Sequence, residues 1–96
     1  MTMYNRAELL NDLYTNLLKV ETEKEMELFL EDLCTIKELE SMAQRLKAAR
    51  MLLDGKTYNE IVEETDISSA TLARVSKCVH YGNGGYKNVL TKPNEP

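Results

Sequence analysis

Small polar and basic side chains gather between residues 68 and 77, where their types and spacing fit contacts to nucleic acid. Hydroxyl groups can donate to or accept from base edges, and arginine or lysine can bind phosphate or guanine. Alanines on the same surface allow close approach to thymine methyl groups. The candidate DNA-contacting residues are Ser68, Ser69, Ala70, Thr71, Ala73, Arg74 and Lys77, together with Tyr58 and Asn59 at the start of the preceding predicted helix.

A pair of short helices must position these side chains. Two helices that cross at roughly 90 to 120° over a turn of 3 or 4 residues need apolar side chains in the first helix, in the turn and on the inner face of the second. The apolar residues with this spacing are Ile61, Ile67, Leu72 and Val75. Asp66 stands where glycine is favoured, but aspartate tolerates a left-handed backbone better than most residues. Residues 57–79 are therefore predicted to form a helix-turn-helix whose recognition helix spans about 68–79.

Four capping boxes divide the chain into helices. Thr or Asn followed three residues later by Glu satisfies two backbone amides at a helix start. These pairs begin at Asn5, Thr22, Thr35 and Thr57, and each precedes an apolar-periodic stretch. The helices predicted on this basis span 5–20, 22–34, 35–54 and 57–65, with a short last helix around Tyr86–Leu90 and a frayed end at Asn94–Pro96.

Each of the first three helices has one apolar stripe, which is predicted to be core. The stripes comprise Leu9, Leu10, Leu13, Leu17, Leu18 and Val20 in the first helix, Met26, Phe29, Leu30 and Leu33 in the second, and Leu39, Met42, Ala43, Leu46, Ala49, Leu52 and Leu53 in the third. Gly55 is predicted to end the third helix in a left-handed conformation. Because a chain of 96 residues buries only a small core, a second copy is expected to complete it.

The net charge of −4, from 12 basic and 16 acidic residues, at first argues against a nucleic-acid binder. The charges are segregated, however: residues 1–44 hold 10 acids and 4 bases, whereas 67–94 hold 4 bases and no acid. Binding requires only that the basic side chains share one surface, and the candidates are Arg74, Lys77, Lys56, Lys87 and Lys92. So few bases predict modest non-specific affinity and a shallow salt dependence.

The composition offers no metal or catalytic site. Cys34, Cys78 and His80 are too few for a four-ligand zinc site, and no nucleophile–base pair or paired-carboxylate site is evident. We therefore predict that the protein is not an enzyme. No apolar run reaches the ~20 residues of a membrane span, and a cytoplasmic location with both thiols packed as small apolar groups is expected.

Five motifs carry a family resemblance over roughly residues 25 to 90. They are Asp32–Thr35, Gln44–Leu46, Ala49–Leu52, Ser68–Val75 and His80–Tyr86. In order and spacing they resemble the Trp-repressor superfamily, and within it the YerC/YecD-type Trp-repressor-related proteins. The resemblance implies one all-α domain over 1–96 that forms an intertwined helical homodimer. Its parts would be dimerisation helices at 5–54, the helix-turn-helix at 57–79, and a short helix and tail at 80–96.

The same resemblance bears on a ligand, because well-studied members use L-tryptophan as a corepressor. Residues of the type expected around that pocket are Thr35, Arg45, Thr71 and Arg74. Val75, however, stands where the pocket uses glycine, and Cys78 stands where it uses serine. A packed isopropyl group is expected to leave no concave site there, so we predict that no cofactor is required. Thr35, Arg45 and Arg74 are kept as candidate ligand-binding residues.

Two functions are compatible with these observations. The first is a dimeric, sequence-specific transcriptional regulator, expected to be a repressor, that places the recognition helix in the major groove of double-stranded DNA. The second is a protein-interaction module that keeps the fold without binding DNA, because an acidic face can recruit a basic partner. Helix-turn-helix spacing also occurs in packing units with no nucleic-acid role, so both alternatives stay open at this point.

Overall fold

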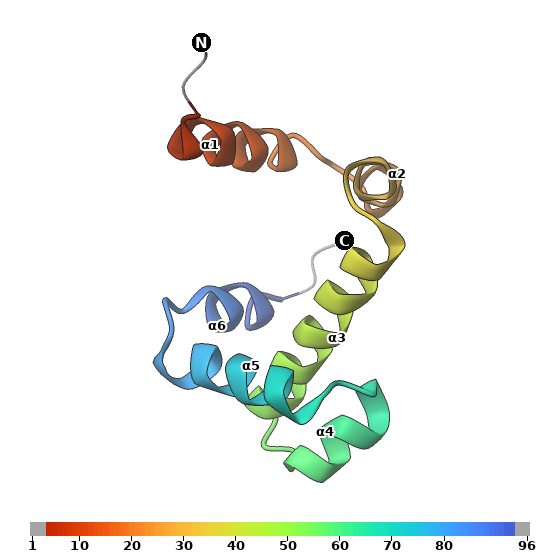
Figure 1. Ribbon diagram of the computed structural model, residues 1–96, viewed down its shortest axis with the longest axis vertical. Helices are drawn as coiled ribbons and strands as arrows, with labels where there is room; N and C mark the ends of the chain where they lie inside the picture. The colour runs from red at the N-terminus through yellow and green to blue at the C-terminus, as the bar shows by residue number, and fades with distance from the viewer. Residues whose placement is uncertain (1–3, 94–96) are drawn as a thin grey trace. The chain divides into compact units, whose positions relative to one another are not determined.

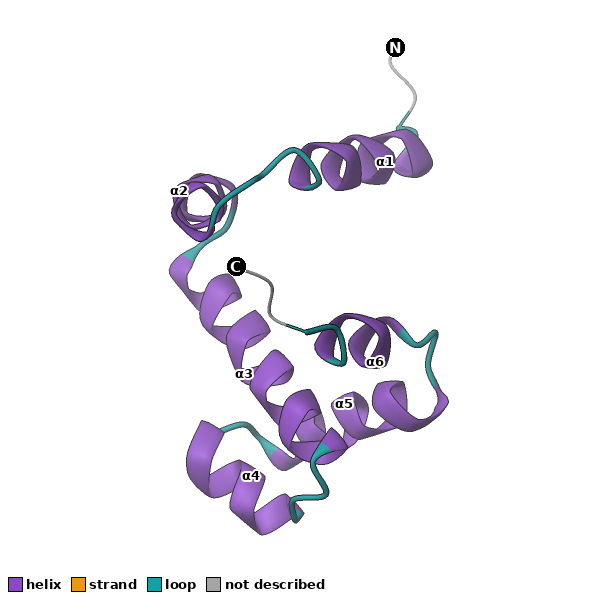
Figure 2. Ribbon diagram, turned by 180° about the vertical axis from the view of Figure 1, so that it is seen from behind, coloured by secondary structure: helices purple, strands orange, loops and turns teal. Residues whose placement is uncertain are grey.

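The computed structural model describes residues 4–93, which form six helices and no strand (Figure 1 and Figure 2). The helices are α1 (Arg6–Leu17), α2 (Glu23–Leu33), α3 (Ile36–Leu53), α4 (Tyr58–Thr65), α5 (Ser69–Tyr81) and α6 (Gly85–Leu90). The predicted all-α class is confirmed. None of the helices in this range is long and apolar enough to span a membrane. The fraying predicted at Asn94–Pro96 lies outside the described residues.

The chain divides into two compact units at the start of α3, with Met1–Ile36 in the first and Lys37–Pro96 in the second. The first unit contains α1 and α2. The second contains the rest of the helices, including the helix-turn-helix formed by α4 and α5. The candidate DNA-contacting residues therefore all belong to the second unit.

Side-chain caps begin the helices near the predicted positions. Asn5 Oδ1 accepts from the backbone amide of Glu8 at 3.1 Å, and Thr22 Oγ1 accepts from that of Glu25 at 3.0 Å. Thr57 makes a full capping box, because its side chain accepts from the backbone of the residue three positions on, whose carboxylate accepts from the Thr57 amide. These caps satisfy amides that the first turn of a helix leaves without partners.

Helix α1 ends at Leu17, three residues before the predicted end. The side chains of Thr15 and Asn16 donate to the backbone carbonyl of Asp12, at 3.1 and 2.7 Å. Such local bonds offer the backbone an alternative to the helical pattern. The amides of Lys19 and Val20 then bond to carbonyls three positions back, as in a tightened last turn.

The core of the second unit lies where α3, α4 and α5 meet. Its buried residues are Ala48, Ala49, Met51, Ile61, Ile67, Leu72, Val75 and Val79, and partly buried Leu52, Leu53, Tyr86 and Leu90 pack against them. The four apolar positions predicted for the helix-turn-helix are all buried. Ala48 and Ala49 are fully covered, and such small side chains allow neighbouring helices to approach closely.

The predicted core stripe of α3 is wrong in part. Met42 and Leu46 remain 38% and 44% exposed, whereas Ala48 and Met51, which the stripe omitted, are buried. The face covered by α4 and α5 is therefore rotated from the face that carries the longest apolar side chains. Ala49 alone among the predicted α3 positions is buried.

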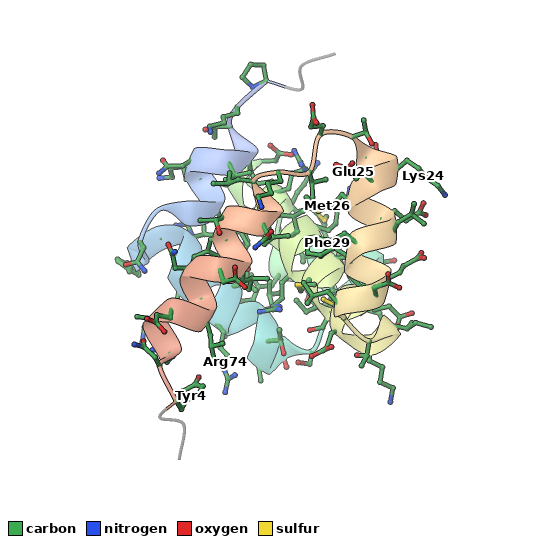
Figure 3. The ribbon with its side chains drawn as sticks, turned by 90° about the horizontal axis from the view of Figure 1, so that it is seen from above. Tyr4, Lys24, Glu25, Met26, Phe29 and Arg74 are labelled. Atoms are coloured by element: carbon green, nitrogen blue, oxygen red, sulfur yellow. The ribbon has the colours of Figure 1, made fainter. Side chains whose placement is uncertain are left out.

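No residue of α1 or α2 is buried within the chain. Figure 3 shows half-buried Met26 and Phe29 on one side of α2 and exposed Lys24 on the other, so this helix has the predicted amphipathic face. Leu18, by contrast, is 84% exposed. Coverage of the apolar positions in the first unit by a second copy stays a prediction.

Candidate nucleic-acid interface

The turn between α4 and α5 sets where the recognition helix begins. Asp66 adopts the left-handed conformation with φ 60° and ψ 20°, as predicted from its residue type, and its amide donates to the carbonyl of Val62 at 2.9 Å. Ile67 then buries its side chain in the core, with 3% of its surface exposed. The turn is thereby anchored between two helices before Ser68 caps α5.

The first turn of α5 is organised by a pair of hydroxyl groups. Ser68 Oγ accepts from the backbone amide of Thr71 at 3.1 Å and donates to Thr71 Oγ1 at 2.9 Å. The Ser68 hydroxyl is therefore used within the helix terminus. Ser69 and Ala70 follow the cap and are exposed.

The outer face of α5 consists of Ala70, Ala73, Arg74 and Lys77, which recur at helical spacing and are all exposed. Arg74 projects outward from the helix (Figure 3). Within residues 4–93, neither basic side chain of this face forms an ion pair with an acid of the chain. The inner positions of the same helix, Leu72, Val75 and Val79, are buried. The helix thus holds a small, unpaired basic surface on a fixed core.

Tyr58 and Asn59 lie in the first turn of α4, the helix that contacts α5. Both are exposed, and Tyr58 presents nearly half of its surface to solvent. The first amides of a helix have no partner within it, so this turn presents donors beside the exposed side chains. All nine candidate DNA-contacting positions therefore belong to the helix-turn-helix, and every one except half-buried Thr71 is exposed.

A hollow of about 460 Å³ opens beside α5, between α3 and α6. Its lining residues are Ser41, Arg45, Thr71, Arg74, Val75, Cys78 and Tyr86. The expectation that Val75 leaves no concave site is therefore wrong, although Val75 itself is only 2% exposed. The isopropyl group packs inward against the core, so the surface above it stays open. The hollow groups Arg45 with Arg74, whereas Thr35 belongs to the first unit.

The thiols only partly follow the sequence expectation. Cys34 is half-buried, but Cys78 is exposed, so its predicted packing as a small apolar residue is wrong. It lies on the side of α5 that faces the hollow rather than the core. In the described part of the chain, no three His, Cys, Asp or Glu side chains gather in a way that could hold a metal ion.

Gly82 closes α5 and can be tested directly. Its amide donates to the carbonyl of Cys78 at 3.0 Å, and a β-carbon at this position would overlap that carbonyl. We expect Gly82→Ala to lower the free energy of unfolding by about 1–3 kcal/mol, measured by urea denaturation. Gly85→Ala is the matched control, because a β-carbon there meets nothing within 4 Å. Equal losses in the two variants would contradict the proposed overlap.

Sequence reasoning missed one contact that supports the interface. Gln44 Nε2 on α3 donates to the backbone carbonyl of Thr65 at the end of α4, at 3.1 Å. The sequence gives a signal for this contact only once the buried face of α3 is known, because Gln44 lies four and seven residues before buried Ala48 and Met51. It therefore shares their buried helical face, where a polar side chain needs a partner.

Residues 8–94 match the family described as Trp repressor protein. The chain belongs to the Trp repressor family. This is a family of DNA-binding regulators rather than of enzymes, and its fold agrees with the helix-turn-helix observed here.

Members of the Trp repressor family resemble the chain over nearly its whole length. The uncharacterized protein YerC of Bacillus subtilis (strain 168) is 43% identical over 90 residues, which are 94% of this chain and 86% of that protein. A TrpR-like protein from Eubacterium eligens ATCC 27750 superposes with a TM-score of 0.85 at 38% identity, covering 88% of each chain. A candidate Trp repressor from Staphylococcus aureus gives the same score and identity over 88% of this chain and 85% of that one. The YerC-type resemblance is thus confirmed.

Proposed function

We propose that the protein is a dimeric transcriptional repressor of the cytoplasm that recognises a specific sequence in double-stranded DNA with α5. The observation that carries the proposal is the outer face of α5, where small side chains stand beside Arg74 and Lys77, which form no ion pair within residues 4–93. The major groove of B-DNA is about 12 Å wide and admits one α-helix. Small residues permit that approach, and the basic pair supplies contacts to guanine or phosphate.

The charge distribution supports the same assignment. Acids are absent from residues 67–94, so nothing in that segment repels the DNA backbone from α5 or α6. With only four bases there, electrostatic binding to arbitrary DNA is weak, and selectivity depends on base contacts. This balance suits a regulator that acts at few sites.

Dimerisation supports the proposal from the first unit. Helices α1 and α2 bury no residue within the chain, and large apolar side chains such as Leu9, Tyr14 and Leu28 remain more than half exposed. A small domain that leaves such residues in water gains stability when a second copy covers them. Two copies related by a two-fold axis would place their recognition helices about 34 Å apart, one turn of DNA.

The hollow beside α5 leads to a proposal about ligands. We propose that L-tryptophan is not required, because the resemblance places glycine and serine in the family's pocket where this chain has Val75 and Cys78, so the hollow differs from that pocket in shape and polarity. Arg45 and Arg74 then serve the fold and the DNA contact, and the hollow above Val75 is open to solvent.

Selection from random-sequence duplex DNA tests the proposal, with sedimentation equilibrium on the same preparation. We expect enrichment of a two-fold symmetric site at physiological salt, with and without L-tryptophan, and a mass twice the 11.0 kDa of one chain. A selection that enriches no sequence would overturn the regulator. If a protein partner is then recovered from lysate even after nuclease treatment, the result would favour an interaction module. The 10 acids of residues 1–44 would suit a basic partner.

A further inference from the structure

A side-chain hydrogen bond attaches the turn of the helix-turn-helix to α3. Gln44 Nε2 donates to the backbone carbonyl of Thr65 at 3.1 Å, and the two residues are 21 positions apart in the sequence. Both are half-buried, so water competes only partly for the two groups. The carbonyl is one of those that the end of a helix leaves without a partner in the helix. Gln44 therefore supplies the partner from a different element.

Thr65 connects this bond to the start of α5. Its Oγ1 donates to the carbonyl of Ile61 at 2.7 Å and accepts from the amide of Ile67 at 3.3 Å. Asp66 between them holds its left-handed conformation, and Ser68 caps α5 one residue further on. Only three residues of backbone therefore separate Thr65 from the first turn of α5.

We propose that Gln44 is a positioning residue for DNA recognition, holding the turn so that the outer face of α5 meets base edges in one register. The proposal rests on the proposed function. Gln44 itself lies on α3 and is not among the residues of the α5 outer face. Base-edge hydrogen bonds lose strength within a few tenths of an ångström, whereas contacts between long basic side chains and phosphates tolerate such shifts. Loosening the turn should therefore reduce discrimination between sequences more than it reduces general affinity for DNA.

Gln44→Met tests this role, because methionine has a similar length and helix propensity but no donor. We expect the Kd for the selected duplex to rise about 5- to 10-fold, and the Kd for a scrambled duplex to stay unchanged. In the free protein, amide hydrogen exchange of Asp66 and Ile67 should become about tenfold faster. Exchange at Leu72, in the interior of α5, should keep its wild-type rate.

Gln44→Lys is the rescue variant, because its longer side chain retains a donor that can reach the carbonyl of Thr65. We expect it to restore slow exchange at Asp66 and Ile67. Wild-type exchange and wild-type discrimination in Gln44→Met would overturn the proposal. So would faster exchange throughout α5, because the residue would then support the fold in general.

The two measurements also separate this inference from the proposed function. Amide exchange is recorded without DNA and reports only whether Gln44 holds the turn. If the wild-type protein enriches no DNA sequence, the proposed function fails and the role in discrimination fails with it. If it enriches a site that Gln44→Met binds as tightly and as selectively, only the positioning role fails.

Discussion

Replacing Arg74 with alanine is expected to reduce affinity for the selected DNA site about 10- to 100-fold while leaving the fold and the proposed dimer intact. Arg74 is exposed, projects from α5 and has no acidic partner within residues 4–93, so the folded protein loses no ion pair (Figure 3). A bidentate arginine contact to guanine contributes about 1–3 kcal/mol of discrimination. Fluorescence anisotropy of a labelled duplex, with circular dichroism for helix content, measures both parts of the prediction.

Two further variants separate base contact from simple charge. Arg74→Lys keeps the positive charge but loses the planar fork of donors, so it should remain weakened on the selected site. Lys77→Ala should weaken binding to all sequences by a similar factor and reduce the slope of log affinity against log salt by about 1, as expected for one phosphate contact. Loss of folding in both alanine variants would contradict the assignment of Arg74 and Lys77 as DNA-contacting residues.

Replacing Ile61 with alanine is expected to lower the free energy of unfolding by about 2–5 kcal/mol, which is a large share of the stability of a small domain. Ile61 is fully buried at the centre of the core that joins α4 to α3 and α5. Truncation leaves a cavity that the close-packed alanines of α3 cannot fill. Urea denaturation at a fixed protein concentration measures the change, because the stability of the proposed dimer would depend on concentration.

Val62→Ala is the matched control for this prediction. Val62 is the next residue of the same helix, but 37% of its surface is exposed, so its truncation should cost well under 1 kcal/mol. A comparable loss in both variants would show that the core does not lie on the Ile61 side of α4.

The helix-turn-helix could be predicted from the sequence because its determinants are local. The Thr57 capping box, the left-handed residue at Asp66 and the Ser68 cap each act within a few positions along the chain. The apolar side chains of this segment, such as Ile67, all lie on one face, so the sequence leaves no choice of which face is buried. Local and tertiary preferences agree in this segment, so periodicity alone places its core.

The buried face of α3 could not be predicted in the same way. This helix has apolar residues on more than one side, with Met42 and Leu46 on one and Ala48 and Met51 on another. Side-chain size favours burial of Met42 and Leu46, but the small side chain of Ala48 allows a neighbouring helix to come close on the other side. Which side is covered depends on where α4 and α5 pack, and that information is not local.

In the candidate site, too, the sequence predicted the residue types on the surface but not the contacts of individual side chains. Residue types indicated which positions of α5 are small, polar or basic, and their exposure agrees with that. They did not indicate that the Ser68 hydroxyl is engaged by Thr71, or that Gln44 is bonded to Thr65. The hollow above Val75 was also missed, because a side chain that packs inward leaves the surface beside it open.

The most direct measurement of the central claim is the ratio of two dissociation constants for the full chain at about 0.15 M salt. One is for the duplex enriched by selection, and the other is for a duplex of the same composition with scrambled sequence. A sequence-specific regulator is expected to bind the first about 10³-fold or more tightly than the second. Equal constants for the two duplexes would contradict the assignment of α5 as a DNA recognition helix.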